Sequence, residues 1–381
     1  MNKYFSFFLT GLLWSCNNQE IEPLNLKYIN LLPSHTISIS CDSNFSISNL
    51  NHQISISENP DAANILIKTN GEVFRIETRD KKVKKVLQIP KEGPGGLSGQ
   101  SDQDGMIFFN DTLWGYTHSW KHKSYLLKPL DAKEVFSLPD DGTKAFIHTQ
   151  FSHPINNGQT ILIPIYNHPV KAKGTDTFSF LRGNLDTEKF EFVIPSPPLY
   201  SEAYWGGAPW QYLPSVVYLA SSKEYVVSFP LDHHLYVYDE AMKLKRKTLL
   251  PSQDLPENFT PFQKEYNENT FDYLKDRKYY GLLSYYFGLV HDPANHRIYR
   301  VVRIVKPDPN NPNSDPISSK NLVVCDEKLN YLGEWKIPPQ YDPSASLFVN
   351  KQGLWLLDDE KLNPEETLLT FDIFDGKFKQ K

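Results

Sequence analysis

The strongest constraint on the fold is a hairpin pattern that recurs along the chain and ends on an apolar residue followed by proline. Each copy has two runs of alternating apolar residues joined by a short polar turn, which is typical of a β-hairpin. Proline suits the position after a strand because it has no N–H to offer a neighbouring strand. The copies end at Ile89-Pro90, Leu138-Pro139, Ile194-Pro195, Leu250-Pro251 and Ile337-Pro338.

Further strands precede most of these hairpins, as in NILIKT (64–69), ILIPIY (161–166) and GLWLLDD (353–359). A sixth hairpin without the proline is predicted at 367–380. Four strands per unit, repeated about six times, predict an all-β chain folded as a β-propeller. Seven blades follow if residues 31–60 form an extra unit, and a plain β-sandwich is the alternative. We expect His35–Cys41 to add a strand to the last blade, within one domain spanning 31–381.

The fifth unit contains an insertion at about 252–283, where the strand pattern stops. Thr260-Pro261-Phe262-Gln263 reads as a helix start with proline at the first helical position. Helical spacing follows at Phe271, Leu274, Lys278 and Leu282. We therefore expect a short helix, which is either a solvated excursion or a lid over one face.

The N-terminus indicates export and lipid attachment. Lys3 precedes the apolar run of residues 4–13, and a small residue, Ser15, stands directly before Cys16. This order is the lipoprotein form of a secretory signal, in which the Cys16 thiol receives the diacylglycerol. The prediction is a signal peptide at 1–15, a tether at 16–30 and anchoring in the outer membrane. The periplasmic and the surface-exposed orientation both stay open.

Composition excludes one class of partner and leaves the two remaining cysteines open. There are 40 Lys and Arg against 45 Asp and Glu, which gives a net charge of −5 and no reason to expect nucleic-acid binding. Hydrophobic residues make up 40% of the chain, enough for a large core. Cys41 and Cys325 either form a disulfide or lie apart as small buried side chains.

Two short motifs carry a resemblance to a known family. Residues 91–97 read KEGPGGL and residues 291–304 read HDPANHRIYRVVRI. Both motifs, and the layout of residues 20–381, resemble a Bacteroidota lipoprotein family known as domain of unknown function 4221. The resemblance implies an anchored lipoprotein with a propeller-like fold. It implies no activity, because the family's role is unassigned.

No motif predicts a catalytic centre, a metal site or a cofactor. Nucleophile-elbow, zinc-protease and phosphate-loop patterns are missing from the sequence. His118 and His122 are four apart, but their surroundings read as a strand and turn. The segment Asp308–Asp315 offers oxygen donors, yet its two prolines and the missing glycine depart from a calcium loop.

The best binding candidates are aromatic residues on a connection between units: Tyr204, Trp205, Trp210 and Tyr212. If exposed, such rings stack on sugars or anchor a partner protein. If buried, they form a wedge between blades. Arg300, on an apolar strand, either faces the central channel or is a hydrogen-bonded residue inside the sheet.

Two functions fit this sequence. The first is a binding or scaffold propeller of the cell envelope that engages a protein, peptide or glycan. The second is a carbohydrate-active hydrolase or lyase, which would need two carboxyl groups converging in one pocket. Fold alone does not decide between them, because propellers serve both roles.

Overall fold

The fold is known from a computed structural model, which describes most of the chain from residue 26 onward. The described residues are 26–41, 54–56, 64–69, 72–88, 105–109, 112–119, 123–127, 135–138, 144–145, 155–156, 160–167, 177–184, 187, 189–267, 269, 271–308, 316–341, 343, 347–362 and 368–380. The predicted lipidation site Cys16, the motif at 91–97, His122 and residues 309–315 lie outside them.

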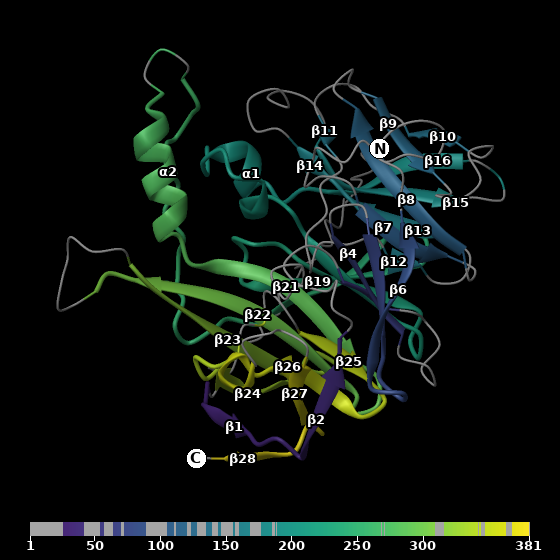
Figure 1. Ribbon diagram of the computed structural model, residues 1–381. Coiled ribbons are helices and arrows are strands. Elements are labelled where there is room, and N and C mark those ends of the chain that lie inside the picture. Colours follow the sequence, from purple (N-terminus) through teal and green to yellow (C-terminus); the bar gives the residue numbers. More distant parts are fainter. Residues whose placement is uncertain are drawn as a thin grey trace, which may run out of the picture.

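The described part is mostly β-structure, organised in antiparallel groups of four strands (Figure 1). Four of its sheets have four strands each. They are β7 to β10 (Gly105–Phe109, Thr112–Ser119, Lys123–Leu127, Val135–Leu138), then β12, β13, β15 and β16 (Ile155–Asn156, Ile161–Pro164, Phe178–Asn184, Lys189–Pro195), then β17 to β20 (Ser215–Leu219, Glu224–Ser228, His234–Asp239, Leu244–Leu249), and β21 to β24 (Tyr285–Asp292, Arg297–Lys306, Ile317–Asp326, Tyr331–Lys336).

A further sheet has eight strands and consists of two four-stranded runs. One run is β3 to β6 (Ile54–Ile56, Asn64–Thr69, Glu72–Glu77, Lys82–Gln88), and the other is β25, β26, β27 and β2 (Phe348–Asn350, Gly353–Leu357, Leu368–Phe374, His35–Ser40). The runs meet where β2 and β6 pair in parallel, at Ser40 and Lys82.

Small elements complete the described structure. Two-stranded pairs form between β1 and β28 (Ile29–Leu31, Phe378–Gln380) and between β11 and β14 (Lys144–Ala145, Tyr166–Asn167). The helices are α1 (Leu199–Glu202), α2 (Tyr273–Leu282) and the 3-10 turns η2 (Pro209–Gln211) and η4 (Asp359–Lys361). No helix in the ranges given above is both long and apolar enough to cross a bilayer.

Within the β17–β20 sheet, polarity changes from the inner strands to the outermost one. Every residue of β18 is buried, whereas β20 (LKRKTL) is exposed along most of its length. The outer strand carries Lys245, Arg246 and Lys247 in succession. Charged side chains on an edge strand discourage pairing with other chains.

The apolar core lies between successive sheets. Leu235 and Val237 of one sheet pack with Ile298 and Val323 of the next. A similar layer joins the β21–β24 sheet to the last strands, where Trp335 packs with Phe374. Face-to-face packing of neighbouring sheets therefore holds the chain together.

The first described strands complete the last group, as the sequence predicts. β2 pairs antiparallel with β27 from His35–Ile373 to Ser40–Leu368. Ile39, the next-to-last residue of β2, is fully buried and packs with Phe74 and Phe371.

The predicted hairpin at 367–380 is wrong in its second half. β27 forms as expected, but β28 pairs with β1 instead of folding back on β27. Gly376, with a φ of 75°, turns the chain away. The place beside β27 is already filled by β2, so β28 has to find another partner.

The predicted helix start at Thr260 is also wrong, since α2 begins at Tyr273. Its N-cap is Asp272, whose carboxylate accepts hydrogen bonds from the backbone N–H groups of Leu274 and Lys275. An Asp cap of this kind satisfies N–H groups that the first turn leaves without a partner.

The structure also decides between the two alternatives for the remaining cysteines. Cys41 and Cys325 are both free thiols and do not form a disulfide.

We predict that Ile39→Ala lowers the free energy of unfolding by about 2–5 kcal/mol, the usual cost of emptying a buried Ile site. Leu32→Ala is the matched control because Leu32 is 49% exposed, and it should cost less than about 0.5 kcal/mol. Denaturant unfolding measures both. Equal, small losses would mean that β2 does not hold the first and last strands together.

Candidate functional site

Two long connections meet at one end of the β17–β20 and β21–β24 sheets. The first, residues 196–214, carries α1 and η2, and the second, residues 250–284, carries α2 (Figure 1). They are joined by an antiparallel bridge between Tyr204 and Gln263, with N–O distances of 2.9 and 3.1 Å. This end gathers four of the five predicted binding residues.

Three of the predicted aromatic residues, Tyr204, Trp205 and Tyr212, are buried. The Trp205 indole N–H donates to the Leu199 carbonyl at 2.8 Å. The Tyr212 hydroxyl donates to the Gly206 carbonyl at 2.9 Å and accepts from the Trp205 backbone N–H at 3.1 Å. These rings therefore pack inside the connection, as expected if they are buried, and they are not presented to a ligand in this structure.

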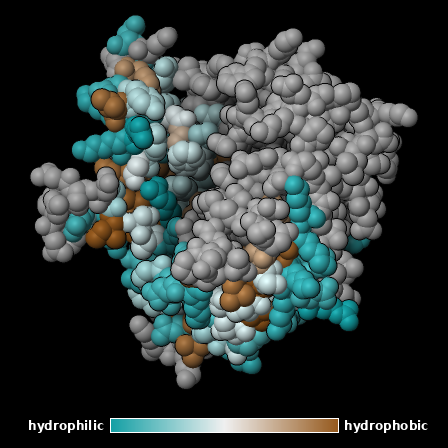
Figure 2. All heavy atoms as spheres, viewed as in Figure 1, coloured by the Kyte–Doolittle hydropathy of each residue, from teal (hydrophilic) through white to brown (hydrophobic). Residues whose placement is uncertain are grey.

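Trp210 is the exception, because 41% of it is exposed. It stands on η2 with its ring edge-on to Tyr280 of α2, at 5.7 Å between centroids. On α2 itself, Leu274 is 74% exposed, and Tyr273 and Leu282 also reach solvent. Figure 2 shows hydrophobic side chains among hydrophilic ones on the projecting column of α2. We call Trp210, Tyr273, Leu274 and Leu282 the α2 surface.

Positively charged side chains lie beside this apolar surface. Lys275, Arg277 and Lys278 are all exposed on α2, and Lys275 forms an ion pair with the capping Asp272 at 3.4 Å. The other acidic residue of the helix, Asp276, is buried. The aromatic and aliphatic groups of the α2 surface thus lie beside an excess of positive charge.

Asp276 ties α2 to the aromatic connection. Its carboxylate accepts the Gly207 N–H at 3.1 and 3.2 Å and the Tyr204 hydroxyl at 3.4 Å. Burial raises the Asp276 pKa, and these two donors offset only part of that rise. The inward carboxyl is therefore held in a site that favours its protonated form.

The neighbouring residues explain why glycine is required here. Gly206 has a φ of 94°, and a Cβ on it would lie 3.0 Å from Gln211 Oε1 and 3.1 Å from Asp276 Oδ1. Any other residue would be strained in this conformation. Gln211 is fully buried, and its side-chain N and O have no hydrogen-bond partner in the described part of the chain.

Arg300 lies elsewhere, buried between the β17–β20 and β21–β24 sheets. Its guanidinium donates to Ser228 Oγ and to the His233 and Leu250 carbonyls, each at 2.9 Å. Its Cζ stands 3.3 Å from the centre of the Tyr286 ring. Burial lowers the Arg300 pKa. Of the two alternatives, the hydrogen-bonded residue inside the protein is the one observed, and Arg300 is not part of the α2 end.

Sequence reasoning missed Asp276, which binds a residue 69 positions away. The adjacent pair Gly206-Gly207 within an aromatic stretch was the only signal of close packing at that point. For metals, the described residues contain no group of three His, Cys, Asp or Glu side chains suited to hold an ion.

Comparison with known proteins gives a family and a fold. The sequence profile described as Domain of unknown function (DUF4221) matches residues 28–336, which confirms the predicted resemblance. No curated protein is similar enough to match this chain.

Solved structures resemble most of this chain at low sequence identity. A DUF4221 family member from Bacteroides vulgatus has a TM-score of 0.69 at 16% identity, covering 93% of this chain and 99% of that one. A putative exported protein from Bacteroides fragilis has a TM-score of 0.52 at 10% identity, with coverage of 93% and 99%. The Cps50 (Swd1) β-propeller domain of Myceliophteria thermophila has a TM-score of 0.40 at 11% identity, with coverage of 91% and 99%.

We predict that Asp276→Asn stabilises the protein relative to the parent as pH rises. The folded-state pKa of Asp276 is raised above 3.8, so its stabilising contribution is complete below the unfolded pKa and is lost as pH climbs through the raised value. Asn keeps an oxygen for the Gly207 N–H and does not titrate. The difference in melting temperature, variant minus parent, should therefore increase from about pH 4 to pH 7.

Glu202→Gln on the exposed helix α1 controls for the loss of one negative charge at the same end of the protein. Its difference from the parent should change much less over the same range. A flat pH profile for Asp276→Asn would show that this carboxyl is not held in a site that disfavours its charge.

Proposed function

This chain belongs to the DUF4221 family, and from that premise we propose that it is a lipid-anchored envelope protein, folded as a closed six-bladed propeller, that binds a protein, peptide or glycan. In this proposal the partner docks on the α2 surface. The observation that carries it is the exposed Trp210, held on a firmly packed base beside the apolar and cationic side chains of α2.

Strand pairing supports the closed ring. The four-stranded sheets and the two halves of the eight-stranded sheet supply six groups of four strands. β2 closes the last group from the beginning of the chain, which is how a ring avoids leaving two open edges.

The sequence and one neighbour support export. Cys16 follows a short apolar run and a small residue, as lipid attachment requires. The resembling Bacteroides fragilis protein is described as exported. The described chain starts beside β1, at the end of the molecule away from α2 (Figure 1).

Binding is favoured over hydrolysis at this end. A glycosidase presents two carboxyl groups to its substrate, one of them with a raised pKa. Asp276 has the raised pKa, but it is buried and its oxygens are engaged by Gly207 and Tyr204. Asp276 therefore connects α2 to the aromatic connection, while the exposed rings beside it are suited to binding a partner.

Anchoring is tested by Cys16→Ser. The variant should move from the membrane fraction to the soluble fraction, because stable attachment of this kind depends on the acyl chains. Cys41→Ser is the matched control and should stay with the membranes. Membrane fractionation followed by immunoblotting measures both, and unchanged sedimentation of Cys16→Ser would contradict the anchor.

Partner binding is tested with the mature chain immobilised against envelope extract and, in parallel, on a glycan array. Trp210→Ala combined with Leu274→Ser should weaken capture by about 30-fold or more, the effect of losing roughly 2 kcal/mol at a hot spot. Leu244→Ser, at an exposed site on β20, should bind like the parent. Equal capture by both variants would remove the α2 surface from the proposal.

A further inference from the structure

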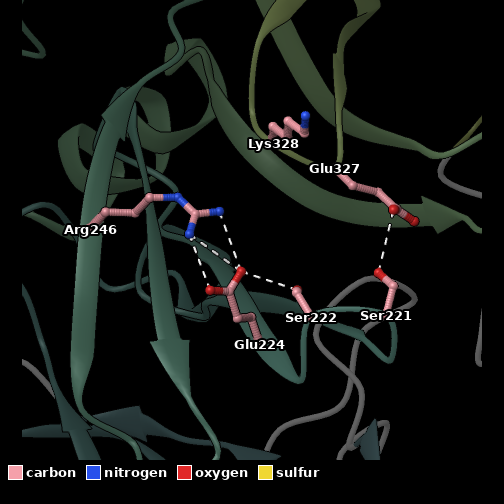
Figure 3. Close-up of a pocket in the computed structure, with 6 residues that line it drawn as sticks. All are labelled: Ser221, Ser222, Glu224, Arg246, Glu327 and Lys328. Atoms are coloured by element: carbon pink, nitrogen blue, oxygen red, sulfur yellow. Dashed lines mark hydrogen bonds and ion pairs between the residues drawn. The ribbon is translucent and has the colours of Figure 1, made fainter.

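A pocket lined by polar and charged residues lies at the opposite end of the β17–β20 and β21–β24 sheets from α2. It opens between the turn that joins β17 to β18 and the turn that joins β23 to β24 (Figure 3). Its volume is about 390 Å³, within the range of small-molecule sites. The lining residues are Ser221, Ser222, Glu224, Arg246, Glu327 and Lys328.

Glu224 forms one wall and is fixed by cations. It is buried, and its carboxylate accepts hydrogen bonds from Lys245 Nζ, from Arg246 Nη1 at 3.2 Å and from Ser222 Oγ at 3.1 Å. Burial alone would raise the Glu224 pKa, but these donors lower it below its ordinary value. The side chain is therefore an ionised, rigid acceptor.

Glu327 forms the facing wall in a similar way. His291 Nε2 lies 2.8 Å from its carboxylate, His296 Nδ1 lies 3.3 Å away, and Ser221 Oγ donates to it at 3.4 Å. Burial would raise the Glu327 pKa, and the hydrogen bonds with the two histidines lower it. Neither glutamate is thus set up as a general acid, which needs a raised pKa.

Among the lining residues, two carboxylates, Glu224 and Glu327, stand against two cations, Arg246 and Lys328. Lys245 and Arg246 both form ion pairs with the Glu224 carboxylate. Lys328 is exposed, and its ammonium forms no ion pair with any residue that the structure describes. Figure 3 shows it above the pocket without an interaction to the other residues drawn. An anion entering here would meet a cation that has no competing partner among the described residues.

We propose that this pocket binds a sugar acid, meaning a small ligand that carries one carboxylate and several hydroxyl groups. Lys328 receives the carboxylate, because both terminal nitrogens of Arg246 already donate to Glu224. The serine hydroxyls and the remaining lone pairs of the two glutamates receive the ligand hydroxyls. This site is separate from the α2 surface and does not depend on the function proposed there.

The test uses the non-lipidated mature chain and D-galacturonate, measured by calorimetry or ligand-observed NMR. D-galactose, which lacks the carboxylate, and acetate, which lacks the hydroxyls, should each bind at least tenfold more weakly. Lys328→Met should weaken galacturonate at least tenfold and remove its advantage over galactose. Lys278→Met, the same change on α2, should leave galacturonate binding as in the parent.

Other outcomes would overturn the proposal. Acetate or a Glu-containing tripeptide binding as tightly as galacturonate would mean that the pocket takes carboxylates without recognising a sugar. Equal losses in Lys328→Met and Lys278→Met would show a general effect of net charge. The proposal would also be refuted if the parent chain bound no galacturonate while both variants kept an unchanged melting temperature.

Discussion

The buried guanidinium of Arg300 is the interaction on which the arrangement of the central sheets depends. It rises from β22 and is surrounded by acceptors from the neighbouring sheet and its connections, including Ser228 and the carbonyl of Leu250. A buried cation without these acceptors would be very costly. The β21–β24 sheet therefore has one position against β17–β20. The pocket at one end and α2 at the other both lie across this junction, so the geometry of both depends on how these two sheets pack.

Much of the fold is readable from the sequence because strand alternation is local. The hairpin of β5 and β6 follows directly from apolar residues at every second position around a polar turn. The addition of His35–Ser40 to the last group could be predicted because that group lacked an outer strand. The partner of β28 could not, because it depends on which strand occupies the place beside β27. The start of α2 was missed because Asp272 and Thr260 are both plausible caps.

The site is less predictable, because its contacts join distant parts of the chain. Aromatic residues at 204–212 could be identified as a cluster, but their burial depends on α2, which is more than 60 positions away. Glu224 and Glu327 carry no motif, and they face one pocket only because two turns of neighbouring sheets meet. Charge type and hydrophobicity are properties of the sequence, whereas convergence is a property of the fold.

The pairing of β2 with β27 also determines the order in which the molecule can mature. The Ser34 hydroxyl bonds to the carbonyl of Ile373, 339 positions along the chain. Contacts of such separation form slowly, because a very long loop must close before they are gained. In a chain that is synthesised, or passes through a membrane, from its N-terminus, residues 35–40 therefore stay unpaired until the region near residue 370 is available. During that interval the apolar residues of β2 lack their partner strand, so the period between synthesis and closure is when this protein is most exposed to aggregation and to proteases.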